Sequence, residues 1–166
     1  SIGKGLMETY GSRQSTIHSV NKTHVRVQAA RIAADEIIPL LAKRDIFWSR
    51  NAFQLKIIYE LDRTLKLNQK KNVRTSTAFE PDWLLQGKSG WVFLQLDTKS
   101  DEKWNRYPKA LLQITDLGIT AKYSASNNLV WVTTLKDGKP VARAKVEIRD
   151  DTNQVLWSGK TGYNGQ

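Results

Sequence analysis

Hydrophobic and polar residues alternate most regularly in the last third of the chain. Over residues 142–148 small or apolar side chains alternate with charged ones, as in a strand with one face on a core and one face in water. Asp137-Gly138 separates this segment from the apolar run 129–135, and an Asp-Gly pair readily adopts the positive φ angles of tight hairpins. The pattern predicts a β-hairpin whose second strand is half-buried.

Earlier segments show the same period of two. It predicts strands over residues 16–20, 24–32, 55–65, 91–96, 111–114 and 119–123. A short helical turn is expected around residues 34–41, with Asp35 as a cap and with Pro39 acceptable only in the first turn. The fold class is therefore all-β, an antiparallel β-sandwich with one short helical insertion.

The strand pattern also divides the chain into segments. Residues 1–10 show no period, so we expect a linker or tail there. Residues 11–118 can form one complete sandwich, whereas residues 119–166 hold only the first strands of a second, because a seven-stranded sandwich takes ~100 residues. Half a sandwich buries too little surface to offset its chain entropy. We therefore expect a fragment of a larger polypeptide.

Composition narrows the class of protein. The chain has no cysteine, which excludes disulfides, thiol catalysis and cysteine-ligated metal sites within it. It contains no signal-peptide pattern and no apolar run near the ~20 residues of a membrane helix. A targeting segment would then lie elsewhere in the larger polypeptide.

The net charge of +10 suggests an anionic partner such as nucleic acid, lipid or a cell-wall polymer. The 26 lysines and arginines are dispersed, however, and the one cluster, KLNQKKNVR at residues 66–74, is typical of a solvated turn. We weigh a solvated surface above an electrostatic binding patch. A nucleic-acid binder would show affinity that falls steeply with salt, but no recognition motif supports it, and we expect no nucleic-acid partner.

Several motifs together resemble a known family. A strand ending in residues 115–118, Thr-Asp-Leu-Gly, is followed by an apolar strand, the turn Gly-Lys-Pro-Val at 138–141 and an alternating strand. This order resembles the junction between two consecutive macroglobulin-like domains of bacterial α2-macroglobulins. Residues 19–21, 71–74 and 90–93 are similar to segments of the family's preceding domain. The resemblance covers nearly the whole chain.

The resemblance implies a structural role rather than a catalytic one. Members of the family are large periplasmic proteins, often lipid-anchored, that trap proteases after cleavage of a bait segment. Some carry a thioester, for which this chain lacks the cysteine, and some occur beside a peptidoglycan synthase. The implied partners are other domains of the parent chain, proteases and, for some members, the peptidoglycan-synthesis machinery. The implied location is the periplasm, and no cofactor is implied.

No group of residues predicts a catalytic, cofactor or metal site. His18 and His24 lie within strand patterns and lack a nucleophile with an orienting group. Two carboxylate pairs are considered for acid–base work and interpreted as surface turn residues: Asp97 with Asp101, and Asp150 with Asp151. There is no Gly-rich phosphate loop. We therefore expect that the chain is not an enzyme.

Six tryptophans keep one alternative function open. Three lie in apolar strands and are expected in the core: Trp91, Trp131 and Trp157. Three fall in less regular stretches, where an exposed indole could stack on a sugar ring: Trp48, Trp83 and Trp104. A cell-wall or glycan-binding adhesive sandwich is thus the alternative to a scaffold function.

Overall fold

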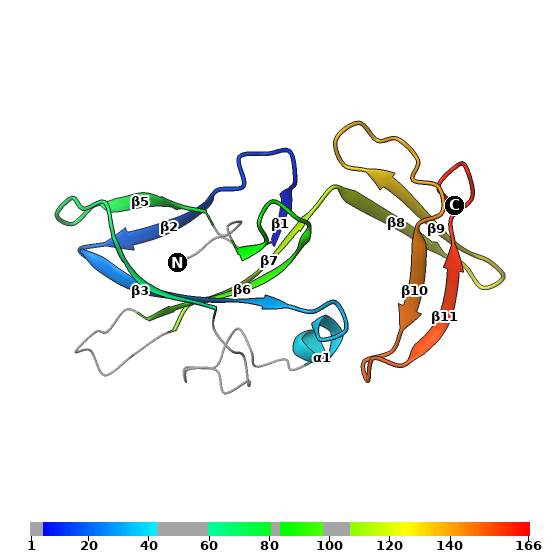
Figure 1. The fold of residues 1–166 in the computed structure, drawn as a ribbon, viewed down its shortest axis with the longest axis horizontal. Coiled ribbons are helices and arrows are strands. Elements are labelled where there is room, and N and C mark those ends of the chain that lie inside the picture. The colour runs from blue at the N-terminus through cyan, green and yellow to red at the C-terminus, as the bar shows by residue number, and fades with distance from the viewer. Residues whose placement is uncertain (1–4, 43–59, 81–83, 98–106) are drawn as a thin grey trace. The chain divides into compact units, whose positions relative to one another are not determined.

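The computed structural model describes residues 5–42, 60–80, 84–97 and 107–166. The chain divides into two compact units, residues 1–114 and 115–166, and each is described by itself (Figure 1). Strands make up most of both units, and every strand pair of known register is antiparallel. The all-β, antiparallel fold class expected from the sequence is confirmed.

The larger sheet of the first unit has five strands in the order β1-β7-β6-β3-β4. Their bounds are β1 Gly5–Glu8, β3 His24–Ile32, β4 Leu61–Lys66, β6 Gly90–Asp97 and β7 Lys109–Thr115. On β3, the alternation predicts that Val25, Val27 and Ala29 share a face, and all three are buried. The alternation in the sequence therefore correctly predicts which face of β3 is buried.

A second sheet pairs β2 (Ser15–Val20) with β5 (Arg74–Phe79). Its inward side chains, among them Ile17 and Phe79, join those of the larger sheet in one hydrophobic core. Leu94 and Ile114 are completely buried in this core. The first unit is thus a sandwich that buries its own apolar faces.

The opposite face of the larger sheet is covered by the helix α1 (Ile37–Ala42). Ile37 and Leu40 pack there with Phe93 of β6, so β6 is apolar on both faces and appears in the sequence as a continuous hydrophobic run. Pro39 lies in the first turn of the helix, where its missing N–H costs no hydrogen bond. The carboxylate of Glu36 accepts a hydrogen bond from the backbone N–H of Ala33, as in a capping box.

One expectation for the first unit is wrong, and another falls mostly outside the described residues. Residues 5–8 were expected to lie in a linker or tail, but they form β1, which is hydrogen-bonded to β7 at the edge of the larger sheet. An edge strand of four residues is too short to show a hydrophobic period. Most of the strand expected over 55–65 lies outside the described residues, which begin again at Glu60, just before β4.

The second unit consists of two hairpins, β8 (Leu117–Tyr123) with β9 (Asn128–Thr134) and β10 (Lys145–Arg149) with β11 (Val155–Lys160). After β9 the chain reverses at Asp137-Gly138, where Gly138 has a φ of 67°. The backbone N–H of Thr134 then donates to the carbonyl of Lys139 over 2.8 Å. The Asp-Gly turn expected from the sequence is confirmed.

The strand expected after this turn is shorter than predicted and has a different partner. Residues 142–144 are not in a strand, because Arg143 adopts a φ of 57° and bends the chain away from β9. The strand begins only at Lys145 and pairs with β11. No side chain of β10 is fully buried, so the predicted half-buried face is wrong for this chain.

Candidate interaction surface

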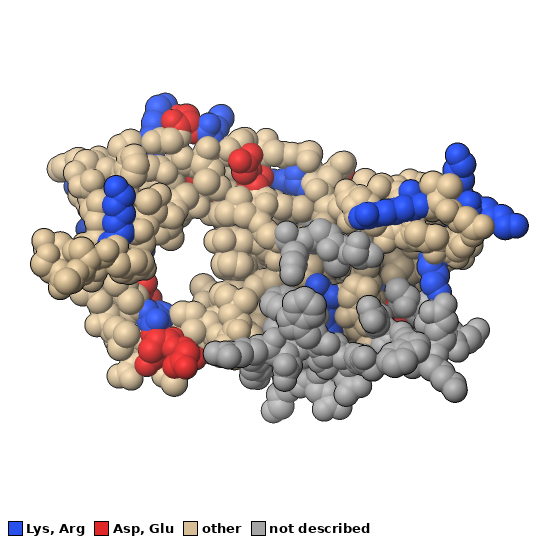
Figure 2. Space-filling view, turned by 180° about the vertical axis from the view of Figure 1, so that it is seen from behind, with Lys and Arg blue, Asp and Glu red and all other residues tan. Residues whose placement is uncertain are grey.

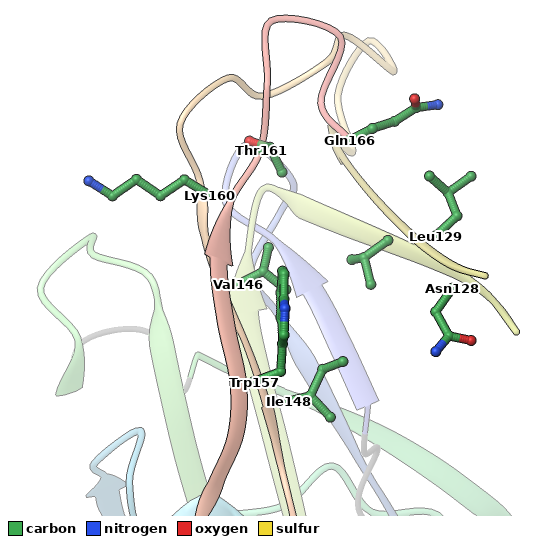
Figure 3. Close-up of a pocket in the computed structure, with 9 residues that line it drawn as sticks. Asn128, Leu129, Val146, Ile148, Trp157, Lys160, Thr161 and Gln166 are labelled. Carbon is green, nitrogen blue, oxygen red and sulfur yellow. The ribbon is translucent and has the colours of Figure 1, made fainter. Parts of the chain in front are cut away.

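The second unit presents an open apolar face. We define it by five residues that line one hollow of about 490 Å³: Leu129, Val130, Val146, Ile148 and Trp157. In Figure 3, Val146, Trp157 and Ile148 of the β10–β11 hairpin lie on one side of the hollow and Leu129 of β9 lies on the other. The hollow is therefore bounded by both hairpins of this unit.

The open apolar face exists because the second unit has almost no core. Between residues 115 and 166, Val132 is the only apolar side chain that is fully buried. Trp131 is 39% exposed and Trp157 is 51% exposed, so the expectation that these two tryptophans belong to the core is wrong. Their strands carry the apolar residues of a core, but the two hairpins do not cover them.

A glycine fixes the position of the Trp157 side chain. Val146 lies opposite Gly159, and Ile148 lies opposite Trp157, so these residues share one face of the hairpin. A Cβ atom at Gly159 would lie 2.4 Å from Cη2 of the indole. Glycine therefore lets the indole ring lie flat along its own strand and widen the apolar face.

The last residues of the chain hold Trp131 in place. Its indole N–H donates a hydrogen bond of 3.0 Å to the carbonyl of Asn164. The carbonyl of Gly165 accepts a hydrogen bond of 2.8 Å from the N–H of Val132. Gly165 has a φ of 81°, and a Cβ atom there would lie 2.6 Å from the carbonyl oxygen of Val132. Only glycine fits this contact.

The other face of β10 is polar. Glu147 forms ion pairs with Lys145 at 2.5 Å and with Arg149 at 2.6 Å. The hydrogen bonds from Lys145 and then from Arg149 lower the pKa of the Glu147 carboxyl. The hairpin thus has one face suited to water and one suited to an apolar partner.

The two histidines considered as catalytic candidates serve as hydrogen-bond partners of hydroxyl groups. Nδ1 of His18 lies 3.0 Å from Oγ of Ser76, across the β2–β5 pair. Nδ1 of His24 lies 3.0 Å from Oγ1 of Thr23, its neighbour in sequence. Within the described ranges, no three His, Asp or Glu side chains are grouped so that they could hold a metal ion.

The carboxylate pairs are not arranged as an acid–base site where the structure describes them. Oδ1 of Asp150 accepts hydrogen bonds from Thr152 and from the backbone N–H of Gln154, which fixes the β10–β11 turn. The hydrogen bonds from Thr152 and then Gln154 lower the pKa of the Asp150 carboxyl. Asp101, the suggested partner of Asp97, lies outside the described residues.

The structure describes one tryptophan of the first unit, Trp91, which was expected in the core. Trp91 is half-buried and packs against the cluster beneath α1. Trp48, Trp83 and Trp104 lie outside the described residues.

None of the helices in the described ranges is long and apolar enough to span a membrane.

Comparisons with known proteins agree with this architecture. Residues 114–166 match a family model described as the bacterial alpha-2-macroglobulin MG3 domain. The whole chain is similar in structure to native alpha-2-macroglobulin from Escherichia coli spanning domains NIE-MG1. The TM-score is 0.74 at 15% identity, over 99% of this chain and 84% of that chain. No curated protein sequence matches the chain.

Two further structures of the E. coli protein match over 99% of this chain. One spans domains MG0-NIE-MG1, with a TM-score of 0.73, 14% identity and 55% of that chain covered. The other is the trypsin-activated protein, with a TM-score of 0.68, 12% identity and 13% of that chain covered. The chain thus has the fold of bacterial α2-macroglobulin domains, and its C-terminal third matches the sequence model of one. This chain spans only a small part of the trypsin-activated E. coli protein.

Proposed function

We propose that this chain supplies scaffold domains of a bacterial α2-macroglobulin and has no catalytic role of its own. One observation carries the proposal: the segment that matches the macroglobulin model folds into hairpins whose apolar face is left open. Covering such a face removes apolar surface from water and is favourable, and an exposed face of this kind marks an interaction site. Other parts of the parent chain, both further strands of the same sandwich and neighbouring domains, are the partners that the proposal assigns to it.

The energy available at the open apolar face is large for so small a unit. A tryptophan buries 150–250 Å² when fully covered, and burial contributes about 25 cal/mol per Å². Covering the exposed half of Trp157 would therefore contribute about 2 to 3 kcal/mol. This is a substantial fraction of the ~5–15 kcal/mol by which a whole domain is stable.

The proposal extends to the parent protein. Its partners would be proteases, captured in the periplasm by the parent molecule rather than by these domains, with the peptidoglycan-synthesis machinery as a further possible neighbour. The trypsin-activated state of the similar E. coli protein supports the protease part. The open apolar face would then help to hold the domain array in the arrangement that responds to cleavage.

Protease capture by the native polypeptide tests this function. An antibody against the chain would identify the polypeptide in fractionated cells, and the purified polypeptide would be mixed with trypsin and separated by gel filtration. We expect a periplasmic polypeptide many times larger than the 18.9 kDa of this chain, eluting together with trypsin after cleavage. Trypsin blocked at its active-site serine is the control and should elute alone.

Either of two results would contradict the proposal. One is a native polypeptide close to 18.9 kDa. The other is active trypsin that cleaves the polypeptide but elutes apart from it.

The half-exposed Trp157 favours glycan binding as the second candidate. Its indole lines a hollow and presents a ring to solvent, as sugar-binding tryptophans do. Binding of the chain to purified peptidoglycan that disappears in Trp157→Ala would support this candidate. No binding by the unaltered chain would exclude it.

A further inference from the structure

Two turns of the first unit lie side by side and form what we call the basic tip, residues 20–24 and 66–74. Val20 lies opposite Arg74, and His24 lies opposite Lys66, in the paired strands. The two turns are also joined directly: the backbone N–H of Leu67 donates to the carbonyl of Thr23 over 2.8 Å. Charges on the two turns are therefore held near one another.

A pair of asparagines makes the basic tip rigid. Nδ2 of Asn21 donates to Oδ1 of Asn72 over 2.8 Å, and the backbone N–H of Asn72 donates to Oδ1 of Asn21 over 2.7 Å. Both asparagines have a positive φ, 53° at Asn21 and 59° at Asn72, as tight turns require. The tip presents its side chains on a fixed backbone.

Five cationic side chains and no acidic residue belong to the basic tip. They are Lys22, Lys66, Lys70, Lys71 and Arg74. None of the five forms an ion pair with a described residue, and all except the half-buried Lys22 are exposed. Figure 2 shows Lys and Arg side chains at this end of the first unit, on the right of the view. Four of these charges belong to the sequence cluster at residues 66–74, and the fold adds Lys22 from the neighbouring turn.

Among the residues that the structure describes, acidic side chains compensate little of this charge. Asp62 accepts two hydrogen bonds, of 2.6 and 2.5 Å, from the guanidinium of Arg26 and so compensates a cation outside the tip. Asp97 is the one acidic side chain among the described residues that line the hollow beside Lys22 and His24. Counted over the described part of the chain, the basic tip therefore keeps a positive excess of four charges.

The side chains between the charges indicate the kind of anionic partner. The tip has no Phe, Tyr or Trp, the large aromatic side chains on which nucleic-acid bases and sugar rings stack best. Four of its five cations are lysines, which act as point charges rather than as planar forks for a single phosphate. Val20 and Val73 are exposed among them and can enter the headgroup layer of a bilayer.

We propose that the basic tip docks on the surface of a membrane that contains anionic phospholipids. Clusters of four to eight lysines and arginines are typical of segments that bind anionic lipids, and each contributes about fivefold to the partition coefficient near the surface. The contact is peripheral, because only the turns reach the headgroups. It is independent of the scaffold function and would orient the first unit with its tip toward the membrane.

Vesicle sedimentation with the whole chain tests the proposal. The probes are vesicles of phosphatidylcholine with phosphatidylglycerol in equal parts, and vesicles of phosphatidylcholine alone. The test variant is Lys70→Gln with Lys71→Gln, and the matched control is Lys122→Gln with Lys136→Gln, two exposed lysines of the second unit. Both variants lose the same charge, so net charge alone cannot separate them.

We expect the chain to bind the anionic vesicles but not the neutral ones, and to dissociate from the anionic vesicles as the salt concentration is raised. The test variant should bind roughly 25-fold more weakly, from two losses of about fivefold each, and the control should lose much less. An equal loss in both variants, or no binding to anionic vesicles, would overturn the proposal. Stronger binding to a DNA duplex than to vesicles, lost in the same test variant, would assign the tip to nucleic acid instead.

Discussion

Replacing Leu94 by alanine should remove a large share of the stability of the first unit. Leu94 is 0% exposed at the centre of β6, and its cross-strand neighbours are Ala29 on β3 and Ala110 on β7. Both neighbours are alanines, so they have no side chain that could move into the space left behind. The cavity should therefore persist, and the cost lies in the upper part of the range for such substitutions, about 3 to 5 kcal/mol.

Urea unfolding followed by tryptophan fluorescence measures this cost. In a background with Trp131→Phe and Trp157→Phe, every remaining tryptophan belongs to residues 1–114 and reports on the first unit. With a denaturant slope of about 1–3 kcal/mol per molar urea, the midpoint should fall by about 2 M. The matched control is Leu6→Ala on the edge strand β1, where the side chain is 51% exposed. Its cost should stay below about 1 kcal/mol.

The comparison between the two leucines decides the outcome. If Leu94→Ala costs less than about 1 kcal/mol, or no more than Leu6→Ala, the sandwich core described for the first unit is not the source of its stability.

Three further predictions concern the second unit. Gly138→Ala should destabilise the second unit by about 1 kcal/mol in thermal unfolding. No atom crowds a Cβ at this position, so only the φ of 67° disfavours alanine, and Gly138→Asn should cost less. Gly165→Ala should destabilise the second unit more than Gly138→Ala in the same assay, because the added Cβ would meet the carbonyl of Val132. Equal destabilisation by the two variants would refute the described contact. The Asp137 carboxyl should titrate with a pKa of about 2 by NMR, lowered first by its hydrogen bond with Lys139, and Lys139→Gln should raise this pKa toward 3.8. The contribution of Asp137 to stability is complete above pH 3.8 and should be lost as the pH falls through 2. A pKa of Asp137 that stays unchanged in Lys139→Gln would disprove the ion pair.

The first unit could be predicted well where its own residues cover both faces of a strand. β3 runs from His24 to Ile32, as its alternation predicts, and β6 extends one residue beyond the predicted run at each end. Periodicity is a local signal of which side chains can be buried, and here the partner sheet and α1 are present to bury them. The edge strand β1 was missed because four residues carry no measurable period.

The second unit shows what local patterns leave out. Trp131 and Trp157 were expected in the core because their strands are apolar, but burial depends on what lies opposite them. The positive φ of Arg143 also delays the start of the expected strand to Lys145, and arginine gives no sequence signal for that conformation. The contact between the two turns of the basic tip is likewise set by strand register rather than by spacing in the sequence.

Hydrogen exchange in the native parent polypeptide tests the central claim most directly, namely that other parts of the parent chain cover the open apolar face. Amide exchange of β10 and β11 would be followed by mass spectrometry in the parent and in the 166-residue chain. The account predicts that these strands exchange slowly in the parent and much faster in the chain alone, while β3 and β6 stay protected in both. Equal, slow exchange of β10 and β11 in both would contradict it, because the face would then need no cover.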